Sequence, residues 1–129
     1  MTNYLNEDTR LVFVYGSLLD GLHNNPVLRD SPLLMEWTTK PEYTLTDQGA
    51  FPAVVEGGTT AIKGELYAVS QDVWESIEYL EGYPHYYGRI TLETPCGDAV
   101  MYTLDSTDRC AIVESGDWRE YYTKQSVRA

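Results

Sequence analysis

The segment from Ser70 to Pro84 constrains the fold more than any other part of the sequence, because it carries both a start and a stop signal for one helix. The Ser70 hydroxyl can accept a hydrogen bond from a free N–H of the first turn, and Asp72 suits the positive end of the helix dipole. Gly82 can adopt the left-handed conformation that often ends a helix, and Pro84 cannot continue one. These signals predict a helix over residues 71–81.

Strand-like runs precede this helix. Residues 11–15 are aliphatic, β-branched or aromatic and end at Gly16, which predicts a buried strand running into a turn. A turn at residues 47–49 separates two further strands expected within 40–55, and residues 61–69 alternate in the manner of a strand. The first half of the chain is therefore expected to contribute mainly to a sheet.

The remaining segments are less regular. Between residues 26 and 35, short apolar patches are broken by turn-forming residues, which predicts a short helix or an irregular layer. Residues 86–94 and 99–104 flank a turn at 95–98, so we expect them to pair as a hairpin. Residues 112–122 contain a tryptophan and are interpreted as a tail that can fold back.

The length of the chain and the order of its elements define the expected architecture. A chain of 129 residues is near the common size of one compact domain. Strands, one central helix and further strands predict an α+β domain, a small mixed or antiparallel β-barrel flanked by a few short helices. We expect a single domain over residues 1–129, with its core at about 11–104 and a C-terminal tail at 105–129.

The charge balance excludes several classes of partner. The formal net charge is −11, from 20 acidic and 9 basic residues, and repulsion of this sign opposes contact with nucleic acid or anionic lipid. No segment approaches the roughly 20 apolar residues of a membrane span, and residues 1–10 lack the apolar stretch of a signal peptide. We therefore expect a cytoplasmic protein without membrane or nucleic-acid partners, whose oligomeric state stays open.

Cysteine and histidine indicate neither a metal site nor a nucleophile. Cys96 and Cys110, taken with His23 and His85, match no zinc-binding spacing, and two cysteines cannot make a disulfide framework. Ser17 lacks the glycine-flanked elbow of a nucleophilic serine. A reducing compartment and a site without metal are the resulting expectations.

One carboxylate falls near the apolar face of the predicted helix. At about 100° per residue, Val73, Ile77 and Leu80 form the stripe that is expected to face the core, with Trp74 on its flank. Glu81 falls between Ile77 and Trp74 on the same projection. This places Glu81 at the edge of the core, unless it turns outward beyond the end of the helix.

The position of Glu81 suits acid/base chemistry. The last turn of a helix and apolar neighbours both disfavour a negative charge, so both raise the pKa of this carboxyl. A carboxylate whose pKa approaches the working pH is a candidate general acid or base. Glu75 and Glu78 are expected on the solvent side, with Glu78 about 60° from Glu81. That arrangement argues against the paired carboxylates of a glycosidase.

The turn after the first predicted strand is a second candidate feature. At Tyr15, Gly16, Ser17 and Leu18, consecutive backbone N–H groups leave the sheet unpaired and can cradle an anion. Gly16 has no side chain that would block a ligand. The segment lacks the further glycines and the lysine of a phosphate-binding loop, and an ordinary tight turn is the alternative interpretation.

The order of these motifs resembles the γ-glutamylcyclotransferase-like family, which includes the AIG2-like proteins and γ-glutamylamine cyclotransferase. The resemblance covers roughly residues 11–104 and implies a compact β-barrel with a few helices. The matching positions are Val12-Phe13-Val14-Tyr15-Gly16-Ser17-Leu18, Gly21 with Asn24 and Leu28, Gly64-Glu65-Leu66-Tyr67, Leu80-Glu81-Gly82-Tyr83, Tyr87 and Arg89.

The resemblance also implies an activity and a role for each site residue. The enzyme would convert a γ-glutamyl amine or γ-glutamyl amino acid into 5-oxoproline and a free amine, without a cofactor. Glu81 would be the acid/base that frees the α-amine to attack the γ-carbonyl. Residues Tyr15–Leu18 would hold the glutamyl moiety through backbone N–H groups, Tyr87 would line the pocket, and Arg89 would hold structure.

Two other classes of function stay open. One is a non-catalytic binding module of the AIG2-like family that keeps the pocket for a small acid or amide. The other is an interaction protein in which the acidic surface matters most. A carboxylate kept at a disfavoured site favours the enzyme, because such a position is costly unless it is used.

Overall fold

The computed structural model describes residues 9–49, 51–105 and 111–128. Within these residues, no helix combines the length and the apolar character that crossing a membrane requires. The elements in chain order are β1 (Thr9–Val14), the 3₁₀ helix η1 (Asn25–Leu28), β2 (Leu33–Thr38), β3 (Tyr43–Asp47), β4 (Pro52–Glu56), β5 (Lys63–Ser70), α1 (Gln71–Glu81), β6 (Gly88–Thr94), β7 (Gly97–Thr103), β8 (Ala111–Ile112) and α2 (Trp118–Arg128).

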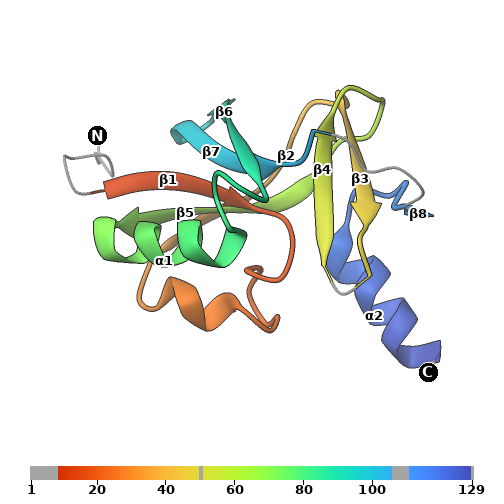
Figure 1. Cartoon of the computed structure of the whole chain (residues 1–129), viewed down its shortest axis with the longest axis horizontal. Coiled ribbons are helices and arrows are strands. Elements are labelled where there is room, and N and C mark those ends of the chain that lie inside the picture. Colours follow the sequence, from red (N-terminus) through yellow and green to blue (C-terminus); the bar gives the residue numbers. More distant parts are fainter. Residues whose placement is uncertain (1–8, 50, 106–110, 129) are drawn as a thin grey trace.

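The strands form two sheets. The larger sheet has the order β2-β5-β1-β7-β6, and the smaller one has the order β4-β3-β8. Among the described strands, β1 and β7 pair in parallel and the other neighbours are antiparallel. Figure 1 shows β3 and β4 running across the direction of β1. The predicted α+β class and mixed sheet are confirmed, whereas the closed barrel stays a prediction because the described strands pair as two separate sheets.

Strand β1 lies at the centre of the larger sheet and is buried on both faces. Leu11 and Phe13 belong to one apolar cluster and Val12 and Val14 to another, on opposite faces of the strand. This explains the continuous apolar run in the sequence, because a central strand covered on both faces does not alternate between apolar and polar residues. The chain leaves the sheet after Val14, and Tyr15 still belongs to the cluster of Leu11 and Phe13.

Helix α1 has the predicted bounds and the predicted caps. The Ser70 hydroxyl accepts a hydrogen bond from the Val73 N–H at 3.3 Å, and Gly82 ends the helix in the left-handed region, with φ of 65°. The expected core stripe is correct for Val73 but wrong for Leu80, which is 39% exposed. Leu80 lies in the last turn, at the rim of a cavity rather than under the sheet.

Two further expectations changed at the level of pairing. The short helix or irregular layer predicted for residues 26–35 is confirmed at η1 but wrong from Leu33 onward. Residues 33–38 form strand β2 against β5, with a bulge between Leu33 and Met35. This segment lacks β-branched apolar residues, so pairing with its neighbour decides its conformation. The expected hairpin is confirmed as β6 and β7, whose ladder closes at Thr94 and Gly97.

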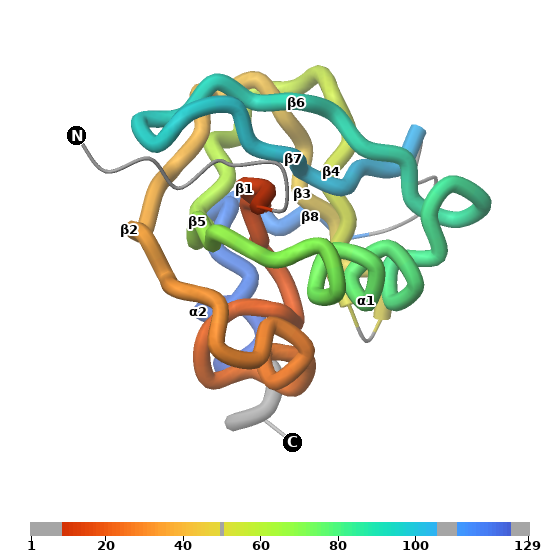
Figure 2. The backbone as a smooth tube through the Cα atoms, turned by 90° about the vertical axis from the view of Figure 1, so that its left-hand side faces the viewer, coloured from red at the N-terminus to blue at the C-terminus, as the bar shows by residue number. Residues whose placement is uncertain are grey.

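The C-terminal segment returns to the body as helix α2, which the sequence had not predicted. Trp118 opens this helix, is 2% exposed and belongs to the core cluster of Phe13. Figure 2 shows α2 beside the loop that follows β1. The division into a core at 11–104 and a tail at 105–129 stays a prediction, and Cys110 lies outside the described residues.

Candidate active site

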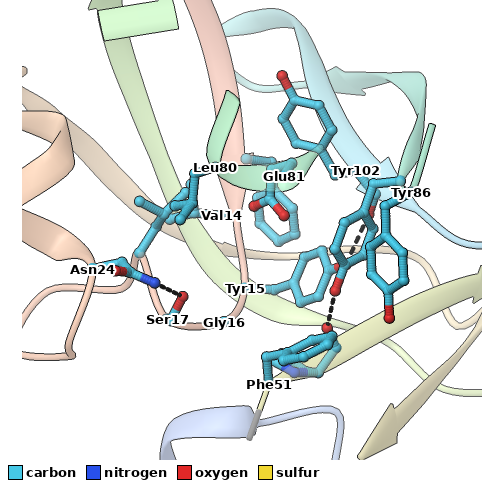
Figure 3. A pocket seen from close by; sticks show the side chains of 14 residues that line it. Val14, Tyr15, Gly16, Ser17, Asn24, Phe51, Leu80, Glu81, Tyr86 and Tyr102 are labelled. Carbon is cyan, nitrogen blue, oxygen red and sulfur yellow. Dashed lines mark hydrogen bonds between the residues drawn. The ribbon is translucent and has the colours of Figure 1, made fainter. Parts of the chain in front are cut away.

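A cavity of about 180 Å³ opens where the loop after β1, the end of α1 and strand β4 meet (Figure 3). All six residues that the sequence placed in the site line it: Tyr15, Gly16, Ser17, Leu18, Glu81 and Tyr87. The other lining residues are Phe13, Val14, Asn24, Phe51, Pro52, Leu80, Tyr86 and Tyr102.

Glu81 is the last residue of α1 and points its carboxylate into this cavity (Figure 3). Burial, followed by the negative charge of Glu78, raises its pKa to about 7. Among the described residues, none donates a hydrogen bond or forms an ion pair to this carboxylate. A carboxyl group of this kind exchanges protons near neutral pH, as a general acid or base must.

Glu78 lies on the side of α1 that faces β7, so its predicted orientation toward solvent is wrong. Its carboxylate accepts hydrogen bonds from the Tyr102 hydroxyl and, at 2.5 Å, from Arg89 Nη1. Arg89 in turn lies over the ring of Tyr83, at 4.2 Å from the centroid. Glu78 is thus a paired carboxylate one turn before Glu81, close enough to influence its pKa but engaged by a cation and a phenol.

The Tyr15 side chain joins the two sheets. Its hydroxyl donates to the Tyr102 carbonyl at 2.7 Å and accepts from the Val54 N–H at 3.2 Å. Burial raises the pKa of the Tyr15 hydroxyl well above the usual range, and the nearby Tyr87 and Glu81 raise it further. The hydroxyl of Tyr15 therefore bridges β7 and β4 through its hydrogen bonds, and the residue contributes to the wall of the cavity.

Gly16 and Ser17 show why this turn has its composition. A Cβ on Gly16 would lie 2.6 Å from Pro52 Cγ, so glycine is needed for β4 to approach the loop. The Ser17 hydroxyl accepts a hydrogen bond from Asn24 Nδ2 at 2.8 Å, and the Asn24 N–H donates to the Ser17 carbonyl at 2.9 Å. The turn is thus braced from within by Asn24, which the sequence had not placed in the site.

Aromatic rings form the wall opposite the loop. Phe51, Tyr86 and Tyr87 meet edge to face, with centroids 5.1–6.5 Å apart. The Tyr87 hydroxyl donates to the Pro52 carbonyl at 2.7 Å, which fixes the ring, while Tyr86 is 52% exposed at the rim. The sequence did not predict Phe51 and Tyr86 as lining residues. The abundance of tyrosine is typical of a partly hydrated pocket, but it does not identify which residues line the pocket.

Metal-binding groups do not gather in the part of the chain that the structure describes. There, no three side chains of histidine, cysteine, aspartate or glutamate are placed to hold an ion. His23 and His85 are exposed in loops.

The sequence and the fold both match known proteins. Residues 12–120 match the family described as γ-glutamyl cyclotransferase, AIG2-like. A Vibrio cholerae protein provisionally named γ-glutamylcyclotransferase is 44% identical over 109 residues, covering 84% of this chain and 94% of that protein. The γ-glutamylcyclotransferase family protein YtfP of Escherichia coli is 32% identical over 108 residues, covering 83% and 94%.

Solved structures agree with this assignment. An uncharacterized protein from Pyrococcus horikoshii superposes with a TM-score of 0.79 at 25% identity, over 92% of this chain and 97% of its own. A mouse AIG2-like protein superposes with a TM-score of 0.69 over 80% and 82%, and at 21% identity it shows the shared fold alone. The chain thus belongs to the AIG2-like γ-glutamyl cyclotransferase family.

Proposed function

We propose that the protein is a γ-glutamylcyclotransferase, which converts a γ-glutamyl amine or γ-glutamyl amino acid into 5-oxoproline and the free amine. The observation that carries the proposal is Glu81, a carboxyl group with a pKa of about 7 that points into a cavity beside the backbone of Tyr15–Leu18. Family membership supports the class of reaction.

In the proposed reaction, Glu81 transfers a proton twice. Its carboxylate takes a proton from the α-ammonium of the substrate, and the freed amine attacks the γ-carbonyl carbon to close a five-membered ring. The protonated Glu81 then gives the proton to the departing nitrogen as the original amide C–N bond breaks. The ring nitrogen loses its second surplus proton, which the released amine takes up to leave as an ammonium ion. A pKa near neutrality suits both steps, because the group must accept and release the proton with similar ease.

The nucleophile and the electrophile belong to one molecule, so the main task of the protein is to hold a folded conformer. Orientation of reacting groups can contribute several kcal/mol, up to about 7–11 in model reactions. The cavity has walls from the loop after β1, from β4 and from α1, which suits it to restrict a small chain. Apart from the proton transfers through Glu81, every bond change occurs within the substrate, so the proposed reaction needs no metal and no cofactor.

The glutamyl end of the substrate would bind to the loop. Backbone N–H groups of Tyr15, Gly16, Ser17 and Leu18 suit a carboxylate, and we assign them to the substrate α-carboxylate. They could equally serve the oxyanion that forms during attack. Tyr87 would line the pocket beside the reacting carbonyl.

The test is release of 5-oxoproline from a panel of γ-glutamyl amines and dipeptides. The parent protein is compared with Glu81→Gln, a near-isosteric change, and with Glu75→Gln as a matched control on the exposed side of the same helix. We expect release by the parent and by Glu75→Gln, and its loss in folded Glu81→Gln. Release by none of the three would leave a binding module, and equal release by all three would remove Glu81 from the mechanism.

A further inference from the structure

A second carboxylate, Glu65, lies buried outside the cavity. The residue is 3% exposed and sits in β5 opposite Val14, the last residue of β1. One carboxylate oxygen accepts hydrogen bonds from the Asp20 N–H at 2.8 Å and from the Tyr67 hydroxyl at 3.0 Å. The other oxygen accepts from Arg119 at 2.8 Å. A buried charge with this many partners is held in one position.

Arg119 completes the contact from the first turn of α2. The nitrogen that pairs with Glu65 also donates to the Asp20 carbonyl at 2.8 Å. Asp20 is therefore held on both sides, its N–H by Glu65 and its C=O by Arg119. Figure 2 shows how the C-terminal helix and the loop after β1 come together, although 99 positions separate Asp20 from Arg119 in the sequence.

The loop that is held here is the loop that lines the cavity. Asn25 Nδ2 donates to the Leu18 carbonyl at 2.9 Å and to the Tyr67 hydroxyl at 3.3 Å, and Tyr67 donates to Glu65. The network that begins at Arg119 thus reaches Leu18, a lining residue of the cavity. Its two anchors, Asp20 and Leu18, lie at the end of the turn whose residues 15–18 line the cavity.

We propose that Arg119, paired with Glu65, is a positioning residue that fixes the loop after β1 and thereby sets the affinity of the pocket for the glutamyl moiety. The proposal rests on the proposed function. Backbone N–H groups bind an anion well only when they are already aimed, because ordering a loose loop during binding subtracts from affinity. The C-terminal helix, which contributes none of the described residues that line the cavity, would act on the substrate through this contact.

A simpler role for Arg119 is to attach α2 to the sheet, and the chain offers a control for it. Lys63 of β5 and Asp117, just before α2, form an ion pair at 3.8 Å. This pair joins the same two regions as Glu65 and Arg119, yet among the described residues neither of its side chains is hydrogen-bonded to the loop. Lys63→Gln therefore removes an attachment of α2 without removing a contact of Asp20.

The experiment compares Arg119→Gln, Arg119→Lys and Lys63→Gln with the parent. KM and kcat are measured for 5-oxoproline release from the best substrate of the panel, and amide hydrogen exchange at Leu19 and Asp20 is followed by NMR. We expect Arg119→Gln to raise KM about tenfold, the effect of roughly one charge-assisted hydrogen bond, with a smaller change in kcat and faster exchange at Asp20. Arg119→Lys should lie between, and Lys63→Gln should match the parent.

An unchanged KM in Arg119→Gln, or equal effects of Arg119→Gln and Lys63→Gln, would overturn the positioning role. If the parent releases no 5-oxoproline, the proposed function fails, and exchange alone decides the inference. Faster exchange at Asp20 in Arg119→Gln but not in Lys63→Gln would then support the loop contact, and unchanged exchange would reject it.

Discussion

Glu65 and Glu81 are both carboxylates next to the core, yet their surroundings have opposite effects on the negative charge. Glu65 receives a guanidinium, a backbone N–H and a phenol. Glu81 faces a cavity walled by aromatic and aliphatic side chains, with a second negative charge one turn away. The first site supplies donors to the carboxylate, and the second disfavours its negative charge.

This difference separates a structural carboxylate from a chemical one. A carboxylate whose two oxygens both accept hydrogen bonds holds its donors in place. A charge that is buried without a partner exchanges its proton near neutral pH and can do acid/base work. Substitution should therefore cost stability at Glu65 and activity at Glu81.

Glu81→Gln should lower kcat by about 10²–10⁴-fold, the usual contribution of a general acid or base. The free energy of unfolding should stay the same or rise, because the change removes a charge that burial disfavours. Urea unfolding and 5-oxoproline release, measured on one preparation, check both halves. A loss of stability as large as that of a Glu65 variant would break the comparison.

Glu65→Leu should lower the free energy of unfolding by about 2–4 kcal/mol, because it leaves the Asp20 N–H and the Arg119 guanidinium without their acceptor. Urea unfolding measures the change. Glu120→Gln is the matched control, since it also removes a glutamate from an ion pair, but an exposed one with Lys124. The control should change stability by less than about 1 kcal/mol, and equal effects would contradict the prediction.

The pH dependences of activity and of stability should both reflect the titration of Glu81. Because burial raises its pKa from 4.5 to about 7 in the folded chain, kcat/KM should rise with pH through about 7, as the carboxylate forms. The folded state holds the proton more tightly than the unfolded state, so the stability of the parent relative to Glu81→Gln should fall between pH 4.5 and 7 and level off above. Denaturant titrations across this range would refute the assignment if the difference were constant.

Glu78→Gln should move the midpoint of the kcat/KM profile to lower pH, because it removes the negative charge that helps to raise the pKa of Glu81. This is the smallest expected effect, since burial is the larger cause. Glu75→Gln serves as the control: its carboxylate accepts from Gln71 on the exposed side of α1 and should leave the midpoint unchanged. A midpoint that moves upward in Glu78→Gln would contradict the electrostatic explanation.

Sequence reasoning succeeded where the cause is local. Ser70 and Gly82 define the two ends of α1 through contacts within a few residues, and these ends carry Glu81 to the last turn of the helix. It failed where a neighbour distant in sequence decides the outcome. Strand β2 exists because β5 offers a pairing edge, and Glu78 turns inward because Tyr102 and Arg89 of the hairpin lie beside it.

The sequence alone therefore determined the buried strand β1 and the bounds of α1, because both depend on short-range pattern. The order of its motifs also carried the family resemblance, from which the six site residues were predicted. Only the tertiary structure decided which side chains complete the cavity and that a C-terminal arginine holds the loop. Glu65 and Arg119 are 54 positions apart, and no local periodicity or spacing connects them. The physical reason is that a buried charge pairs with groups that lie close to it in the folded chain. Those groups become neighbours only once the sheets and helices have packed together.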